Sequence, residues 1–216
     1  MIVHVKNLIA TQTTALSIDE RNLVVQAYKG KTKELRGSFN ALAACEKREK
    51  ELAAASTKAA AAKAYKEKIA TQLRECCDDI ITLISDVLLK RDIDNVGEIY
   101  FQKTKADYYR YRAEASDDAT ASSDVGHAKD LYEVAHKNAQ FVLGSADPTR
   151  LGLALNYSVF MHDVLGEQQD AVALAREAFE EALDHVDKLE KADYKESTGI
   201  LELLRDNLTI WSESME

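Results

Sequence analysis

The chain has 216 residues, which is enough to bury a sizeable core without disulfides or a structural metal ion. Its 37 acidic and 28 basic side chains give a formal net charge of -9, so most of the surface should repel nucleic-acid backbones and anionic lipids. One proline, eight glycines and 7% aromatic residues, beside abundant alanine, leucine, lysine and glutamate, fit helices and fit a β-sandwich badly. The composition therefore predicts an all-α protein and disfavours general nucleic-acid binding.

Cysteine usage and hydropathy predict a reduced, intracellular setting. Cys45, Cys76 and Cys77 are odd in number and two are adjacent, which argues against a disulfide framework. The start of the chain lacks the pattern of a signal peptide, and no apolar run reaches the roughly 18 residues that a membrane span needs. We expect a soluble, cytoplasmic protein.

Helical periodicity divides the first half of the chain into long segments. A helix is predicted over residues 19–52 and a second over about 57–90, and their charged opposite faces favour antiparallel packing as a hairpin. Asp94 is predicted to cap a third helix over 95 to about 115. The polar stretch 116–124 is predicted to be a loop.

The second half continues the same pattern. Asp147 followed by Pro148 predicts a capped helix start, and Gly166 predicts a break. Four helices are predicted here, over residues 125–143, 148 to about 165, 172–186 and 193–213. Helix pairs joined by short turns favour a single domain over residues 1–216, an antiparallel helical array similar to a TPR superhelix but without a strict repeat period.

Two pairs of cations are spaced by seven residues. Lys29 and Arg36 share one face of the first long helix, and Lys103 and Arg110 repeat the spacing on the third. If the two helices face each other, the arginines can present planar forks to a phosphate. With 30% charged residues, such pairs also arise by chance, so a solvated face is the alternative interpretation.

The cluster 107–111, Asp-Tyr-Tyr-Arg-Tyr, favours the anion-site interpretation. Three tyrosines around Arg110 indicate a partly buried charge, which needs a partner. Asp107 and Glu114 are candidate internal partners of this arginine, and a ligand anion is the external candidate. Tyr111 adds a hydroxyl donor beside it.

Two asparagines, Asn156 and Asn207, lie among apolar residues of predicted helices. An amide offers a donor and an acceptor, so the pair can hold the main chain of an extended peptide; satisfied interhelical amides are the alternative. The apolar wall of such a site would consist of Leu155, Val159, Ile200 and Leu203.

Signals for catalysis are weak. The sequence has no HExxH, CxxC, Walker, GxGxxG or GxSxG motif. His162 beside Asp163 is interpreted as a surface or interhelical pair, and Asp78-Asp79 as the wet side of a helix. We expect no enzyme activity, no metal and no cofactor.

Four segments in order along nearly the whole chain closely resemble 14-3-3 proteins: RNLVVQAYKG (21–30), DYYRYRAE (107–114), RLGLALNYSVF (150–160) and LLRDNLTIW (203–211). The resemblance implies a cup-shaped helical domain with a concave amphipathic groove. It implies a signalling adaptor that binds phosphoserine or phosphothreonine peptides of client proteins, commonly as a dimer.

The resemblance also implies roles for individual residues. The phosphate-binding residues would be Lys29, Arg36, Arg110 and Tyr111. The peptide-binding residues would be Asn156 and Asn207 on the peptide main chain, with groove positions Lys103, Leu155, Val159, Ile200, Leu203 and Trp211.

Several positions depart from the family pattern. Gly199 and Arg112 stand where leucine is usual, and Phe39-Asn40 where Trp-Arg is usual. The chain also starts about one helix short, so a homo- or heterodimer is expected to be weakened or lost if this amino terminus is native. We expect retained phosphate recognition with an altered peptide preference. The alternative is a helical scaffold that binds unphosphorylated partners, with an altered or inactive phosphate pocket.

Overall fold

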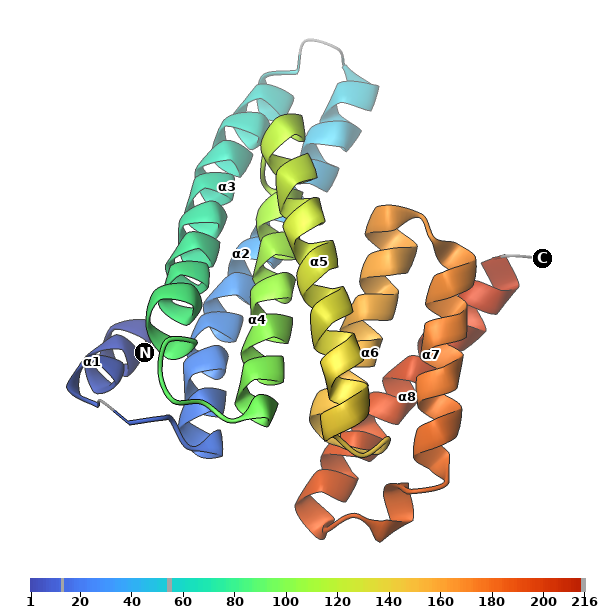
Figure 1. Ribbon diagram of the computed structural model, residues 1–216. Helices are drawn as coiled ribbons and strands as arrows, with labels where there is room; N and C mark the ends of the chain where they lie inside the picture. The colour runs from blue at the N-terminus through green and yellow to red at the C-terminus, as the bar shows by residue number, and fades with distance from the viewer. Residues whose placement is uncertain (13, 54–55, 215–216) are drawn as a thin grey trace. The chain divides into compact units, whose positions relative to one another are not determined.

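The computed structural model describes residues 1–12, 14–53 and 56–214, and these contain no strand. The α-helices in chain order are α1 (Ile2–Thr11), α2 (Ile18–Leu52), α3 (Thr57–Leu83), α4 (Asn95–Glu114), α5 (Asp118–Val142), α6 (Pro148–Phe160), α7 (Gln168–Leu183) and α8 (Lys191–Ser214) (Figure 1). Two π-helical turns, η1 (Ile84–Leu88) and η2 (Met161–Leu165), extend α3 and α6, and a 3-10 turn, η3 (Val186–Lys188), precedes α8. The predicted all-α class is confirmed.

The chain forms two compact units. Unit 1 consists of Met1–Gly97 and Thr104–Ala128, and unit 2 consists of Glu98–Lys103 and Lys129–Glu216. The chain therefore passes from one unit to the other within α4 and within α5. A single domain over residues 1–216 stays a prediction.

The core of unit 1 is organised by the long hairpin of α2 and α3. These helices run antiparallel and side by side, as the sequence predicts (Figure 1). The apolar stripe of α3 and η1 is completely buried at Leu73, Ile80 and Ile84, and Tyr28 of α2 is buried with it. Burial of these stripes, rather than helix propensity, is the main source of stability for such long helices.

Helix starts and stops follow the local signals in the sequence. The Ser17 hydroxyl and the Glu20 carboxylate form a reciprocal capping box at the start of α2. Asp94 accepts a hydrogen bond from the Gly97 amide at 2.6 Å, and Asp147 accepts one from the Thr149 amide at 2.8 Å. Gly166, at φ 71°, ends η2 in the left-handed conformation that glycine adopts without steric cost.

Three sequence predictions need correction. The predicted loop over 116–124 is wrong, because α5 begins at Asp118 and only Ala115–Asp117 separate it from α4. Asp117 caps this start by accepting from the Thr120 amide at 2.9 Å. Helix α1 was not expected at all, and α7 ends at Leu183, so that Val186 lies in η3.

Gly97 allows a buried cation to approach the start of α4. Arg21 is 6% exposed and donates from Nε to the Leu16 carbonyl and from Nη1 to Asp94, both at 2.9 Å. A Cβ at Gly97 would lie 2.4 Å from Arg21 Nη1. We therefore expect Gly97→Ala to lower the free energy of unfolding by about 2 kcal/mol, measured by urea denaturation.

A matched control for Gly97→Ala is Gly126→Ala, because an added Cβ at this exposed position in α5 has no atom within 4 Å. It should raise the free energy of unfolding by up to about 1 kcal/mol. Equal stability of Gly97→Ala and the wild type would contradict the steric argument.

Glu46 of α2 binds two lysines, Lys50 of the same helix and Lys66 of α3. Its side chain is 7% exposed and accepts hydrogen bonds from Lys50 and Lys66, each at 2.6 Å. Hydrogen bonds from Lys50 and then from Lys66 lower the pKa of Glu46 from its ordinary 4.5 to about 2. A lowered folded-state pKa contributes stability above the unfolded-state pKa, and this contribution is lost as pH falls from 4.5 toward 2.

We therefore expect Glu46→Gln to lower the urea midpoint most at neutral pH, with the difference from the wild type disappearing as pH approaches 2. Urea titrations at several pH values measure this. Glu51→Gln, at an exposed position of the same helix, is the control and should show no such pH dependence. A difference that stays constant over this pH range would rule out the ion pairs as its cause.

Unit 2 is built around α6, α7 and α8, each of which packs against the other two. Leu151, Leu153 and Phe160 of α6 are fully buried, as is Leu204 of α8. The Ser197 hydroxyl of α8 is also buried and donates to the Ala146 carbonyl at 2.7 Å. Helix α8 is thereby fixed against the start of α6.

The three cysteines differ in accessibility. Cys45 of α2 is exposed, whereas Cys76 and Cys77 of α3 are buried, and all three are free thiols. Burial raises the pKa of both buried thiols. As for membranes, none of the helices in the described part of the chain combines the length and apolarity required to cross a bilayer.

Candidate functional site

The four predicted phosphate-binding residues all belong to unit 1. Lys29 and Arg36 lie on α2, and Arg110 and Tyr111 lie in the last two turns of α4. Lys29 is exposed and Arg36 is half-buried, while the Arg110 side chain is only 11% exposed. The burial of Arg110 expected from its tyrosine neighbours is confirmed.

Tyr111 brings the two arginines together. The Arg36 guanidinium carbon lies 4.1 Å from the centre of the Tyr111 ring, and that of Arg110 lies 4.6 Å from it. Such cation–π contacts draw two like charges to one neutral ring. Burial raises the pKa of the Tyr111 hydroxyl, so at neutral pH this group remains a hydrogen-bond donor.

Two carboxylates hold the arginines. Both oxygens of Glu114 accept hydrogen bonds from Arg36, from Nε and from Nη2, each at 2.7 Å. Asp107 lies 3.7 Å from Nη2 of Arg110. Asp107 is therefore a partner of Arg110, as expected, and Glu114 binds Arg36 across α2 and α4, a pairing that the sequence does not predict. This bidentate pair uses two of the five N–H donors of Arg36 and fixes the plane of its guanidinium.

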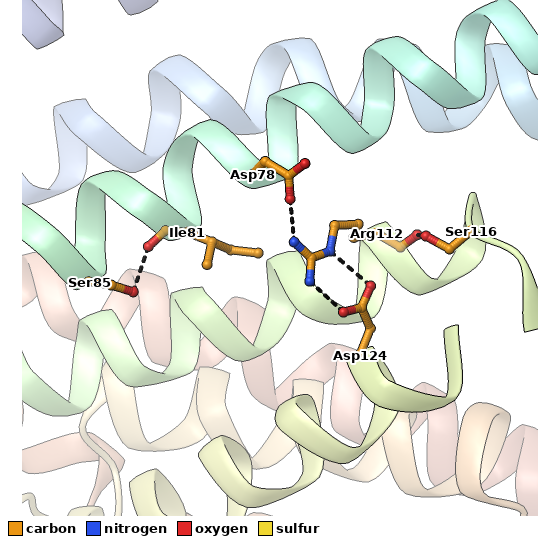
Figure 2. A network of polar contacts seen from close by, with 6 residues as sticks. All are labelled: Asp78, Ile81, Ser85, Arg112, Ser116 and Asp124. Atoms are coloured by element: carbon orange, nitrogen blue, oxygen red, sulfur yellow. Dashed lines mark hydrogen bonds and ion pairs between the residues drawn. The ribbon is translucent and has the colours of Figure 1, made fainter. Parts of the chain in front are cut away.

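A second ionic network centres on the neighbouring residue Arg112 (Figure 2). Its guanidinium donates from Nε to Asp124 at 2.8 Å and from Nη2 to the other oxygen of the same carboxylate, while Nη1 donates to Asp78. Asp78 belongs to α3 and Asp124 to α5, so one side chain of α4 connects three helices. Asp124 is 2% exposed, and the hydrogen bonds to it are the main cause that raises the pKa of Arg112.

The structure refines the interpretation of Asp78-Asp79 as the wet side of a helix. The Asp78 side chain is 54% exposed, as that interpretation predicts, and is also ion-paired with Arg112. Asp79 is half-buried and accepts a hydrogen bond from Tyr28 at 2.7 Å. The sequence does not predict the role of Asp124, because it predicts a loop for this segment. The acidic residues Asp117 and Asp118, which suit the start of a helix, were the signal for it.

The predicted peptide-binding residues all belong to unit 2. Lys103 lies on α4, the next three on α6 and the last four on α8: Lys103, Leu155, Asn156, Val159, Ile200, Leu203, Asn207 and Trp211. Both asparagines are half-buried, Leu203 is 53% exposed and Trp211 is 6% exposed. Gly152 lies between two members of this set, because a Cβ there would be 3.8 Å from both Ile200 and Lys103.

The sequence predicts a surface or interhelical pair of His162 with Asp163, and the structure shows a further contact of this histidine. Its Nδ1 lies 2.7 Å from the Asp163 carboxylate, as the pair interpretation requires. In addition, its ring stacks on Trp211, with ring centroids 4.5 Å apart. No sequence signal pointed to this stack.

No metal centre is visible in the described ranges, since no three His, Cys, Asp or Glu side chains lie together as a metal ion would require. What the geometry of unit 1 offers is a preformed set of cationic forks beside a neutral hydroxyl. This arrangement suits binding of an anion.

Comparison with known proteins agrees with the resemblance in the sequence. The family model described as "14-3-3 protein" matches residues 1–212. The chain is 38% identical to a 14-3-3 protein of Eimeria tenella over 93% of this chain and 72% of that relative. It is 37% identical to 14-3-3 protein 2 of Entamoeba histolytica over 100% of this chain and 89% of that relative. It is also 35% identical to the checkpoint signal transducer rad25 of Schizosaccharomyces pombe, over 96% and 77% of the two chains. The chain therefore belongs to the 14-3-3 family.

Proposed function

We propose that this chain is an adaptor that binds phosphoserine or phosphothreonine peptides of client proteins. The observation that carries the proposal is the placement of Arg36 and Arg110 against one tyrosine ring, with guanidinium carbons 4.1 and 4.6 Å from its centre. Membership of the family supports the client-binding adaptor role, and no enzyme activity is proposed.

The charge of the cluster suits a single phosphate group. Arg36 and Arg110 are its cations, and the carboxylates of Glu114 and Asp107 offset part of their charge. Lys29 lies seven residues before Arg36 on the same helix face and is proposed as a third cation. A phosphoester carries about -1.5 to -2 charges at neutral pH, so it is attracted more strongly than a hydroxyl or a carboxylate. Arginine forks supply paired hydrogen bonds, and Tyr111 supplies a neutral donor.

The rest of the peptide is assigned to side chains of unit 2. The half-buried amides of Asn156 and Asn207 can each donate to and accept from a peptide main chain. Leu203 offers an apolar surface to side chains of the client, because it is 53% exposed. An amphipathic groove in this family member is part of the proposal.

Fluorescence anisotropy with a phosphoserine peptide and its unphosphorylated twin tests the function. We expect the phosphorylated peptide to bind about 100-fold more tightly, since charge-assisted hydrogen bonds to the phosphate supply most of the affinity. Equal weak binding of the two peptides would refute the proposal. That result would instead support the alternative of a scaffold for unphosphorylated partners.

We also propose that the chain forms a homo- or heterodimer through unit 1. Large apolar side chains are exposed there on α1, α2 and α3: Val3, Ile18, Leu23 and Tyr65. Light scattering at several concentrations measures the mass in solution. A monomer at every concentration, also with any natural upstream residues restored, would refute the homodimer.

A further inference from the structure

The only tryptophan of the sequence is in face-to-face contact with a histidine. Trp211 lies near the end of α8, and His162 lies in η2. Their ring centroids are 4.5 Å apart and their planes differ by 11°. Both residues belong to unit 2, and Trp211 is 6% exposed. The imidazole therefore covers one face of the indole.

In the described part of the chain, only one of the two ring nitrogens of His162 makes a hydrogen bond, so the contact of this side chain with Trp211 is made by the face of the ring. A carboxylate only accepts hydrogen bonds, so Nδ1, at 2.7 Å from Asp163, carries a hydrogen and donates it. Nε2 is buried and has no hydrogen-bond partner within the described ranges. A buried ring nitrogen without a hydrogen-bond partner costs stability, and a phenyl ring at this position would avoid that cost. The choice of residue is not explained by stability alone.

The backbone holds the imidazole in place. Residues Met161–Leu165 form the π-helical turn η2, and π-turns inside helices are frequent at functional sites. The Met161 carbonyl accepts hydrogen bonds from the amide of the left-handed Gly166 and from that of Glu167, the latter at 2.9 Å. These bonds fix the backbone that carries His162, and the hydrogen bond to Asp163 orients its ring.

The two stacked residues follow the other proposed peptide-binding residues along the chain, Trp211 on α8 and His162 after α6. On α8, Leu203, Asn207 and Trp211 follow one another at intervals of four residues, which places them along one face. On α6, Leu155 and Val159 share a face, and His162 follows in the next turn. Because His162 contacts Trp211, the wall residues of α6 and of α8 are connected through the two rings.

We propose that His162 is a positioning residue of the peptide site, whose ring holds the Trp211 indole in place for contact with client residues that flank the phosphorylated one. This inference rests on the proposed function. The imidazole acts through its stacked face and makes no contact with the phosphate. Its effect should therefore depend on how far the peptide extends from the phosphoresidue.

The test compares His162→Ala, which removes the stack, with His162→Phe, which preserves an aromatic face. Acrylamide quenching of the single tryptophan reports the cover on the indole directly. Anisotropy then measures the affinity for a long phosphoserine peptide and for the same peptide reduced to phosphoserine and its immediate neighbours. His185→Ala, at an exposed histidine of unit 2, is the matched control.

We expect His162→Ala to increase quenching and to weaken the long peptide about fivefold, with the short peptide unchanged. His162→Phe should restore both readouts, and the control should resemble the wild type. Unchanged affinity of His162→Ala for the long peptide would overturn the inference. So would a His162→Phe variant as weak as His162→Ala, because it would assign the effect to an imidazole nitrogen.

The binding data distinguish a failure of the proposed function from a failure of this inference. The wild type would then bind the phosphorylated and unphosphorylated long peptides equally. His162→Ala measured against the unphosphorylated long peptide would still decide the inference, since a loss of affinity supports the positioning role and no loss refutes it.

Discussion

Replacing Arg112 by leucine is expected to lower the free energy of unfolding by about 3–5 kcal/mol. The change leaves the Asp124 carboxylate, which is 2% exposed, without the guanidinium that donates two hydrogen bonds to it. An unpaired buried charge is among the most destabilising changes in a folded protein. Urea denaturation followed by circular dichroism measures the loss.

Two further variants separate the buried charge from the loss of the arginine itself. The double variant Arg112→Leu/Asp124→Leu removes both charges and should recover most of the stability. Arg205→Leu is the surface control, because Arg205 and Asp206 are 62% and 60% exposed; it should cost less than about 1 kcal/mol. A double variant as unstable as Arg112→Leu would show that the unpaired carboxylate is not the cause.

Arg36→Glu is expected to weaken phosphopeptide binding at least about 100-fold. The variant removes one of the two guanidiniums at Tyr111 and places a negative charge beside Glu114. Both changes oppose a phosphate dianion at the proposed site. Anisotropy with the phosphoserine peptide measures the effect.

The control for Arg36→Glu is Arg48→Glu, which makes the same charge change at an exposed position of the same helix. It should leave the affinity within about twofold, because exposed charges farther than a Debye length from a ligand are screened by salt. Similar losses in both variants would point to the net charge of the protein and contradict a localised phosphate site.

Most of the fold could be predicted from local signals. The boundaries of α2, α4 and α6 follow Ser17, Asp94 and Asp147-Pro148, whose side chains or ring geometry act within a few residues of themselves. Helix α1 has no such signal, since Met1 provides no side-chain cap. The start of α5 is polar in composition, and it is stabilised by the contact of Asp124 with Arg112 on another helix. The periodicity of the sequence cannot predict a contact between side chains of two different helices.

The candidate site also has features that the sequence predicts and features that depend on how the helices pack. The seven-residue spacing of Lys29 and Arg36 predicts a shared helix face, because it depends only on helix geometry. The choice of Glu114 as the partner of Arg36, and the position of both arginines at Tyr111, depend on how α2 packs on α4. The contact of His162 with Trp211 likewise requires α6 and η2 to meet α8.

Because only one of the three thiols is exposed, a distance in the wild-type chain can be measured by energy transfer to a dye attached at that thiol. A maleimide dye should attach at the exposed Cys45, since the buried Cys76 and Cys77 have raised pKa values and little thiolate at neutral pH. Cys45 belongs to unit 1 and the single tryptophan, Trp211, to unit 2. Energy transfer from the indole to a dye on Cys45 would therefore report the separation of the two units in solution, and its change when a client peptide binds.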